Sequence, residues 1–387
     1  MQPFCSLFSQ ILKVIPRSRF EQLTRKHGSE RHARGFTSWQ QLVAMLFCHI
    51  GRAQSLREIE HGLRSAQGKL SHLGIEVPHR STLSYANEHR PWQLFESLFY
   101  VVLEQCRSAR PGRHALRFKN PLLSVDSTTV ELVSEMFSWA RYNKRKGAIK
   151  LHLVLDHDGL LPTYAVVTDL GSGDITVGRT IKFEAGSVVV FDRGYIDYEW
   201  LRSLDTRGVF FVTRLKKTAH FKVIEERTLP RSRSVIRDQV VDLTHVRRST
   251  RGGFVPLRLR RVEIVDPETD KHLVFYSNLM DFGATTISRI YKQRWQIELF
   301  FKALKQNLKI KTFIGTSANA LRIQLWTALI AMLLIRYLKL KSASPVSLSN
   351  LVAMLRFHLF SYRELWAWLR SPFEPAHPPP ALQLSLL

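Results

Sequence analysis

The pattern of apolar and polar positions divides the chain into a helical first part, a strand-rich middle and a helical last part. Within the first 110 residues, apolar side chains recur at three- and four-residue spacing, as in TSWQQLVAMLFCHI (37–50), which predicts amphipathic helices. Ser55 and Glu58 form a capping box ahead of the next helix, and a third helix is expected to begin near residue 81. This order is typical of a helix-turn-helix module and equally of a small helical bundle, so DNA contact by these helices stays open.

The middle of the chain is rich in short β-branched runs. LLSVDSTTVEL (122–132) and SVVVF (187–191) predict buried strands, and YEWLRSLDTRGVFFVTRL (198–215) predicts a helix followed by a strand. The segment AIKLHLVLDHDGLLPTYAVVT (148–168) alternates around an Asp-Gly turn, which predicts a hairpin. Short Arg- and Val-rich segments between 215 and 280 predict an antiparallel β insertion.

Helices are expected again from about residue 285 to about residue 370. The most apolar run, IQLWTALIAMLLI (323–335), has 13 residues, whereas a membrane-spanning helix needs roughly 20. It therefore predicts a buried core helix and no membrane span.

The fold class expected from this order is α/β, with an all-α domain in front. The predicted segments are a helical domain at 1–110, a basic linker at 107–121, an α/β core at 120–340 that contains the β insertion at 215–282, helices at 341–375 and a loose Pro-rich tail at 376–387.

The charge balance indicates a polyanionic partner. The chain has 57 Lys and Arg against 32 Asp and Glu, a net charge of +25, and such an excess repels itself in a free protein. Nucleic acid is favoured over a membrane surface or a ribosomal role. Three widely spaced cysteines match no metal motif and indicate a reducing compartment, and the N-terminus lacks the features of a signal peptide. We expect a cytoplasmic protein.

Two aspartates each end an apolar run. Asp126 ends the run PLLSVD and Asp192 ends the run SVVVFD. An acid at the end of a buried strand lies at the rim of a sheet, where metal and ligand sites form. For either residue alone, capping of the following turn is the more ordinary explanation.

A third acid lies in the basic segment YKQRWQIELFFKALKQNLKIK (291–311), which predicts one helix. At 100° per residue, Tyr291, Arg294, Glu298 and Lys305 share a stripe about 60° wide that borders the apolar face, so the stripe is expected to line a crevice. The competing explanation is a surface row of ion pairs at four-residue spacing, which stabilises a helix only weakly.

Three converging carboxylates at Asp126, Asp192 and Glu298 would hold two Mg²⁺ (or Mn²⁺) ions roughly 4 Å apart, which suits in-line displacement at a phosphodiester. Cations next to such a cluster reduce its repulsion of DNA. Arg294, Lys305 and Tyr291 are therefore the predicted phosphate contacts.

At these residues the sequence resembles the insertion-sequence-four family of bacterial DDE transposases. Tyr291-x2-Arg294-x3-Glu298-x6-Lys305 matches the helix signature of that family. FDRGY (191–195) and SVDSTTV (124–130) resemble its two aspartate motifs, and the segment from PRSRFEQL to about Asn87 resembles an N-terminal domain found on many such transposases.

The resemblance implies an RNase H-like core with a β-rich insertion between the second aspartate and the glutamate. It implies that Asp126, Asp192 and Glu298 are metal ligands and that Tyr291, Arg294 and Lys305 contact DNA. It also implies two phosphoryl transfers: cleavage that frees a 3′-OH at each element end, and attack of that 3′-OH on target DNA. The partners would be the terminal inverted repeats and target DNA, which a homodimer of the protein would bind. The protein would be bacterial and associated with the nucleoid.

One feature departs from the family. Some members cut the second strand through a DNA hairpin, with a tryptophan of the insertion stacked near a flipped base, but residues 215–282 contain no Trp. An aromatic face of another residue can stack on a base. The substitutes are Phe221, Phe254, Phe275, Tyr276, Phe282 and Trp295, although packing is the favoured role for Trp295.

Other charged residues have ordinary explanations. Asp156 and Asp158 flank His157 but precede a glycine, which favours a turn over a metal site. His152 alternates within a strand and is expected to be packed, and Arg193 either pairs with Asp192 or contacts phosphate. The basic run Lys144, Arg145, Lys146 and Lys150 is expected to contact phosphate.

Two alternatives to a transposase remain. The first is a metal-dependent DNA nuclease on the same fold, and the second is a DNA-binding relative that has lost activity. The presence of all three acids and all four helix residues disfavours the second alternative.

Overall fold

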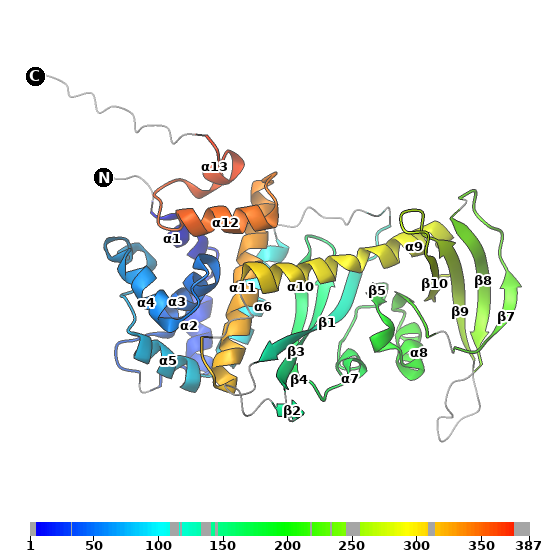
Figure 1. The fold of residues 1–387 in the computed structure, drawn as a ribbon, viewed down its shortest axis with the longest axis horizontal. Coiled ribbons are helices and arrows are strands. Elements are labelled where there is room, and N and C mark those ends of the chain that lie inside the picture. The colour runs from blue at the N-terminus through cyan, green and yellow to red at the C-terminus, as the bar shows by residue number, and fades with distance from the viewer. Residues whose placement is uncertain are drawn as a thin grey trace, which may run out of the picture. The chain divides into compact units, whose positions relative to one another are not determined.

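The structure is a computed structural model that describes residues 5–31, 33–108, 116, 118–132, 141–143, 146–216, 219–232, 234–244, 256–308 and 314–374. Lys144, Arg145, Phe254, the tail at 376–387 and most of the predicted linker lie outside the described residues. The chain forms two compact units, a helical unit of Met1–Ala109 with Gln306–Leu387 and an α/β unit of Arg110–Lys305 (Figure 1).

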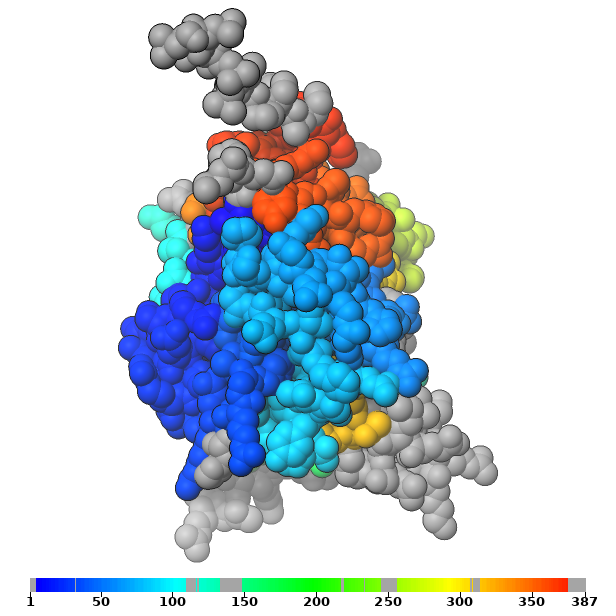
Figure 2. Space-filling view, turned by 90° about the vertical axis from the view of Figure 1, so that its left-hand side faces the viewer, coloured from blue at the N-terminus to red at the C-terminus, as the bar shows by residue number. Residues whose placement is uncertain are grey.

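The helical unit is built from segments at both ends of the chain. Its N-terminal helices follow the predicted periodicity, and Thr37 caps α3 through a capping box with Gln40. Figure 2 shows the N-terminal helices and the C-terminal helices on one continuous surface. The helices with their bounds are α1 (Leu7–Leu12), α2 (Arg17–Lys26), α3 (Ser38–Gly51), α4 (Leu56–Arg64), α5 (Arg80–His89), α6 (Gln93–Arg107), α11 (Ala318–Ser342), α12 (Leu348–His358) and α13 (Leu365–Arg370).

The predicted 13-residue apolar run lies within α11, which has 25 residues. Its length and composition would allow it to cross a membrane, but 83% of the apolar window is buried inside the protein. It packs against α3, α5 and α6, so the predicted core helix is present and is longer than its apolar run. This packing also places 318–340 with the helical unit and not with the α/β core in which the sequence-based boundary at 340 had placed it.

Buried polar contacts fix α3 to later parts of the helical unit. The ring of His49 is 1% exposed, and its Nδ1 and Nε2 lie 3.1 Å from the Leu308 carbonyl and 2.9 Å from Thr327 Oγ1. Arg52 follows α3 in the left-handed conformation and donates to the Gln306 carbonyl at 3.0 Å. His49 and Arg52 thus provide hydrogen-bond partners for carbonyls at the C-terminal end of α10 (Trp295–Asn307) and just beyond it. Such terminal carbonyls have no partner within their own helix.

The α/β unit contains a mixed sheet that has ten strands among the described residues. Its central part runs β4-β3-β1-β5-β6; β1 is antiparallel to β3 and parallel to β5, which is parallel to β6. This is the predicted mixed sheet, and the hairpin around Asp158 and Gly159 is confirmed as β3–β4. The strands are β1 (Leu122–Leu132), β2 (Arg141–Asn143), β3 (Lys146–Asp156), β4 (Leu161–Asp169), β5 (Val188–Phe191) and β6 (Phe210–Thr213).

Helices cover both faces of this sheet (Figure 1). On β5, Val189 and Phe191 pack in the cluster that includes Trp200 of α8 (Tyr198–Thr206), whereas Val188 and Val190 pack with Ile287 of α9 (Ala284–Gln293). Successive side chains of a strand point to opposite faces, so this alternation defines an α8 face and an α9 face. Valine and phenylalanine fit a strand that is buried on both faces.

The predicted β insertion is present and extends the central sheet. Strands β7 (Phe221–Glu226), β8 (Val235–Leu243), β9 (Leu257–Val265) and β10 (His272–Ser277) are antiparallel to one another, and β10 pairs with β6. Arg260 of β9 forms a buried two-bond ion pair with Asp238 of β8 at 2.6 and 2.7 Å. The same guanidinium donates to the carbonyls of Leu279, Met280 and Phe282, just before α9.

The stability of the helical unit is expected to decrease as the pH falls, because burial lowers the pKa of His49 to about 4 from a usual value of 6.5. Between these values the unfolded chain takes up a proton that the folded chain does not, so the free energy of unfolding falls with pH by about 2 kcal/mol at pH 5. Urea unfolding of the protein and of His49→Gln at neutral pH and at pH 5 measures this effect.

The glutamine variant is expected to lose less stability on acidification, because it has no ring to protonate. His152, whose pKa burial also lowers to about 4, contributes equally to both proteins and cancels in the comparison. An identical pH dependence in the two proteins would rule out His49 as the source.

Candidate active site

Asp126 and Asp192 are next to each other because β1 and β5 are paired in register. The pairing ends at Val125 opposite Phe191, and each aspartate is the next residue along its strand. Neighbouring strands lie roughly 4.8 Å apart, and both aspartates have the parity of the residues that point to the α9 face. The strand predicted over 122–132 is present as β1, so Asp126 ends its apolar run but not its strand, which continues antiparallel to β3 as far as Leu132.

A backbone N–H fixes each aspartate. The Ser127 N–H donates to Asp126 Oδ1 and the Gly194 N–H donates to Asp192 Oδ1, both at 2.8 Å. Asp192 thereby caps the short 3-10 turn Arg193–Tyr195. A Cβ on Gly194 would lie 3.1 Å from Asp192 Oδ1, so the glycine allows the close approach of backbone and carboxylate.

Arg294 connects the strands to the signature helix. Its guanidinium donates to Asp126 at 3.4 Å and to Glu298 at 2.5 Å. The predicted single helix is divided at this residue into α9 and α10 (Trp295–Asn307), because the Arg294 N–H bonds to Tyr291 and the Ile297 N–H bonds to Arg294, each only three residues apart.

The electrostatics of the site are those of crowded carboxylates in a half-buried crevice. The pKa of Asp126 is raised to about 7, mainly by burial and also by the charges of Asp192 and Glu298, while the Ser127 N–H and Arg294 oppose the rise. Burial disfavours the charge of Arg294, but Tyr291, Glu298 and Asp126 together raise its pKa. The side chains of Asp126, Arg294 and Glu298 are 16%, 18% and 32% exposed, so solvent reaches the site from the Glu298 side.

The other two signature residues lie on either side of this group. The Tyr291 ring is half-buried against Phe275, 4.9 Å between centroids, and the Arg294 guanidinium lies 5.7 Å from its centroid. The Lys305 ammonium donates to the Thr129 carbonyl of β1 at 2.8 Å. Both residues therefore contact the α/β unit itself, and their contact with DNA stays a prediction.

The structure separates the aromatic substitutes for the missing tryptophan. Phe275 and Tyr276 are buried at 1% and 6% exposure, so neither presents a face to a base. Phe221 and Phe282 pack partly against the two core clusters. Trp295 is 56% exposed, so the packing role predicted for it is wrong, and its ring is accessible next to Arg294.

The remaining sequence predictions have mixed outcomes. Asp156 accepts the Asp158 N–H at 2.8 Å, as a turn residue does. His152 is buried, with its Nε2 2.9 Å from Thr168 Oγ1, which confirms a packed histidine. Lys150, predicted to contact phosphate, forms an ion pair with Asp174 at 3.1 Å. Arg193 is exposed and makes no ion pair with Asp192 within the described part of the chain.

The chemistry of the donor set suits a divalent metal ion, since three carboxylates supply the hard oxygen ligands that Mg²⁺ and Mn²⁺ prefer. Within the described ranges, no three His, Cys, Asp or Glu side chains are grouped closely enough to hold a metal ion. The Arg294 guanidinium places a positive charge between Asp126 and Glu298.

The sequence prediction missed Asp174, the first residue of α7 (Asp174–Gly178). Ser127 donates to its carboxylate at 2.7 Å, and Lys150 does so from β3. The only local signal is its place after a Gly-Ser-Gly turn, where an acid at a helix start is common.

Two family models match the chain. Residues 117–334 match a model described as "Transposase DDE domain", which is more than half of the chain, and residues 5–76 match a "Domain of unknown function (DUF4372)". The first match contains all three acids. The chain belongs to the insertion-sequence-four family of DDE transposases. As a DDE transposase it is an enzyme that cuts DNA and transfers strands, and such transposases typically use divalent metal ions.

The sequences of curated relatives match most of the length of the transposase. A putative transposase y4zB of Sinorhizobium fredii is 33% identical over 78% of this chain and 83% of its own length. A probable transposase for insertion sequence element IS5377 of Geobacillus stearothermophilus is 30% identical over 92% of each chain. A putative transposase for insertion sequence element IS4SA of a Synechocystis strain is 23% identical over 84% of this chain and 90% of its own length.

One solved structure, a piggyBac transposase synaptic complex with hairpin DNA, covers 97% of this transposase and 81% of its own chain. Its identity is 12% and its TM-score 0.42, a likeness too slight to support conclusions about fold or function.

Asp126 of the metal-free transposase is expected to titrate near pH 7 instead of near its usual 3.8. Asp192→Asn removes a neighbouring negative charge and is expected to lower this pKa, whereas Arg294→Met removes a cation and is expected to raise it. Carboxyl ¹³C NMR of Asp-labelled protein measures both shifts, with the Asp126 signal assigned by its loss in Asp126→Asn. Asp169→Asn is the matched control, and equal midpoints in all variants would contradict the close arrangement of charges.

Proposed function

We propose that this transposase cleaves the ends of its element and transfers each freed 3′-OH to target DNA, with Asp126, Asp192 and Glu298 as its catalytic carboxylates. The observation that carries the proposal is the pair of contacts made by Arg294. They join the aspartate strand β1 to the glutamate helix α10, and the register of β1 with β5 adds Asp192 to the same face.

The three carboxylates would hold the metal ions. When bound, two Mg²⁺ or Mn²⁺ ions activate the attacking oxygen and stabilise the leaving oxygen of a phosphodiester. The N–H groups of Ser127 and Gly194 keep one oxygen of Asp126 and of Asp192 in place, and the second oxygen of each would act as a metal ligand. The second oxygen of Asp126 accepts from Arg294 and would become a ligand when the guanidinium turns to a phosphate.

Arg294 has a second task in this proposal. Without DNA it neutralises Asp126 and Glu298, and a DNA phosphate offers it a competing bidentate acceptor. Lys305, which extends from the same helix to the edge of β1, would hold a phosphate on the other side of Glu298. Tyr291 orients the Arg294 guanidinium by stacking and borders the bound strand.

DNA is the partner expected from the family and from the net charge of +25. The α/β unit would bind the scissile strand, and the helical unit and the β insertion would recognise the terminal inverted repeats. Two element ends must be brought together, so a homodimer would form on DNA. The enzyme would act in the bacterial cytoplasm on the nucleoid.

A metal-dependent nuclease on the same fold is the second candidate, because one carboxylate site performs hydrolysis and strand transfer alike. The two functions separate in an assay with a pre-cut 3′-OH end and a circular target. Joined products support the transposase, whereas cleavage without joining under all conditions supports the nuclease.

Removal of one catalytic carboxylate is expected to abolish both reactions. Asp126→Asn, Asp192→Asn and Glu298→Gln should each lose at least about 10³-fold in cleavage and in joining, because ligand and charge are lost in the transition state. Binding of the same DNA without metal should persist, since each change removes a negative charge that faces the phosphates. Gel assays with DNA from both flanks of the reading frame measure the three quantities.

Asp169→Asn is the control, because Asp169 is an exposed acid in the same unit whose carboxylate accepts hydrogen bonds from Ser172 of its own turn. Metal-dependent cleavage retained by an Asp192 or Glu298 variant would refute the assignment of the site.

Trp295 is expected to stack on a base beside the cleaved bond. Trp295→Ala should weaken binding of end DNA by about 1–3 kcal/mol, whereas Trp295→Phe should keep most of the affinity, because stacking needs an aromatic face. Fluorescence of 2-aminopurine at the terminal positions reports the stacking directly. Leu299→Ala is the matched control, since Leu299 is also exposed one turn along α10. An equal loss in the alanine and phenylalanine variants would exclude stacking.

A further inference from the structure

A cluster of polar side chains lies on the α8 face of the sheet, opposite Arg294. Its centre is Asp174 of α7, whose Oδ1 accepts from Ser127 Oγ at 2.7 Å and from Lys150 Nζ at 3.1 Å, with His152 Nδ1 at 3.6 Å. Ser127 pairs with His152 across β1 and β3, so these side chains share a face. The proposed DNA chemistry uses none of these four side chains.

The Asp174 carboxylate lies next to Ser127 and Gly194, the two residues whose N–H groups fix Asp126 and Asp192. Ser127 donates its N–H to Asp126 and its hydroxyl to Asp174, so one residue connects the two carboxylates through the plane of the sheet. Gly194 donates its N–H to Asp192, and a Cβ placed on Gly194 would lie only 3.3 Å from Asp174 Oδ2. Asp174 therefore accepts a hydrogen bond from the side chain of the residue that fixes Asp126 and lies next to the glycine that fixes Asp192.

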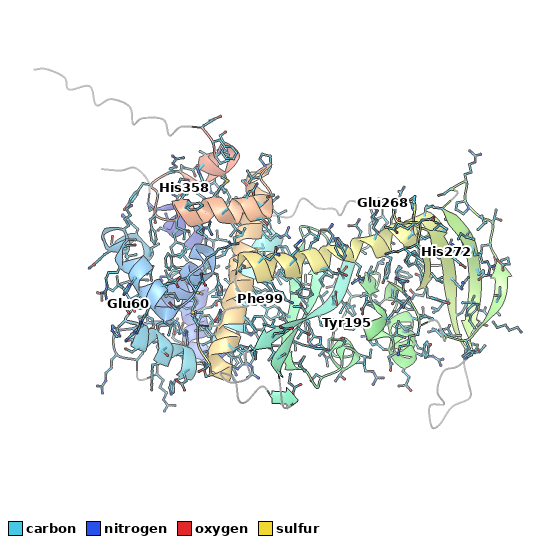
Figure 3. All side chains as sticks on the ribbon, viewed as in Figure 1. Glu60, Phe99, Tyr195, Glu268, His272 and His358 are labelled. Carbon is cyan, nitrogen blue, oxygen red and sulfur yellow. The ribbon has the colours of Figure 1, made fainter. Side chains whose placement is uncertain are left out.

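The surroundings hold this carboxylate in place. The Asp174 and Lys150 side chains are 23% and 19% exposed, so their ion pair is largely shielded from water. Tyr195, labelled in Figure 3, belongs to the apolar cluster with Trp200 and Leu201 on the α8 face, where it is 1% exposed. Burial and the nearby charges of Asp174, Asp126 and Asp192 raise the pKa of the Tyr195 hydroxyl, which also interacts with Ser127. The cluster thus connects packed apolar side chains to the residues that fix the two aspartates.

We propose that Asp174 is a positioning residue of the transposase, which sets the spacing of Asp126 and Asp192 by holding Ser127 from one side and the Gly194 turn from the other. This inference rests on the proposed function, because it assigns Asp174 a task toward the same two carboxylates. Asp174 itself does not touch DNA or the reacting atoms. Lys150 keeps the Asp174 charge compensated, which explains its position within the sheet and not on a DNA surface.

The alternative is that the cluster only attaches α7 to the sheet. A purely structural role predicts lost stability and an unchanged reaction per folded molecule. A positioning role predicts the reverse, because residues behind metal-binding groups typically change metal affinity or turnover by 10- to 100-fold when replaced. The two roles are separated by measuring metal affinity, turnover and stability on the same variants.

The test is Asp174→Asn in the full-length protein, a replacement of nearly the same shape that removes the charge. Expected results are a fall of about 10- to 100-fold in turnover, an unchanged KM for end DNA, and an unchanged midpoint of urea unfolding. Binding of Mn²⁺ to the DNA-free protein, followed by the electron paramagnetic resonance of free Mn²⁺, should weaken by a similar factor. Asp169→Asn is the matched control and should leave all four quantities unchanged.

Ser127 provides a second test that holds if Asp174→Asn does not fold. Ser127→Ala removes the hydroxyl and should reproduce the losses, whereas Ser127→Thr keeps a hydroxyl and should restore turnover and Mn²⁺ affinity. The Asp174→Asn/Ser127→Ala double variant should lose no more than the worse single variant, because both act through one hydrogen bond.

The outcomes separate this inference from the proposed function. Normal Mn²⁺ affinity and turnover in Asp174→Asn and Ser127→Ala, together with an inactive Asp126→Asn, would overturn the role of Asp174 alone. An active Asp126→Asn would overturn the proposed site itself. A lowered unfolding midpoint with normal Mn²⁺ affinity would show that the cluster is structural, which also overturns the inference.

Discussion

Arg294 donates to Asp126 of β1 and to Glu298 one turn further along α10, and the arrangement of the site follows from this pair of contacts. Burial is the main reason that the pKa of Asp126 is high, and repulsion from the charges of Asp192 and Glu298 adds to the rise. A cation between them offsets that repulsion. The 3-10 turn that divides α9 from α10 is centred on the same residue. The break between the two helices therefore lies at the residue whose guanidinium contacts Asp126 of β1.

The pleat of the sheet decides what lies on each side of this ion pair. Even-numbered residues of β1 face α9 and Arg294, and odd-numbered residues face α7 and α8. Asp126 and Ser127 are adjacent in sequence and therefore lie on opposite faces, yet the Ser127 N–H bonds to Asp126. Ser127 therefore connects the two faces, because its N–H bonds to Asp126 on one face and its hydroxyl bonds to Asp174 on the other.

Much of the fold could be predicted from the sequence, because local signals were strong. Periodicity and caps specified α3 and α4, an Asp-Gly turn specified the β3–β4 hairpin, and alternating valines specified the insertion. The limits were non-local. Burial by α3, α5 and α6 extends α11 beyond its apolar run.

The residues of the candidate site likewise fall into those that local sequence patterns predicted and those that depend on non-local contacts. A four-residue signature on one helix identified Arg294 and Glu298, whereas no pattern in DLGSGDIT (169–176) distinguishes Asp174 from other acids at helix starts. Its relation to Ser127 and Gly194 depends on three strands and a turn that come together only in the folded unit. The sequence also favoured a packing role for Trp295, whereas the folded unit leaves its side chain 56% exposed.

The ion pair of Arg260 with Asp238 has a consequence for how this enzyme can change its architecture. The same guanidinium donates to three carbonyls immediately before α9. Strands β8 and β9 of the insertion therefore hold the segment that leads to the signature helix in place. Excision of those strands would leave buried carbonyls without donors and would loosen the approach to α9. We therefore expect changes in length to be tolerated around the outer strand β7 and not within β8 and β9, which carry Asp238 and Arg260.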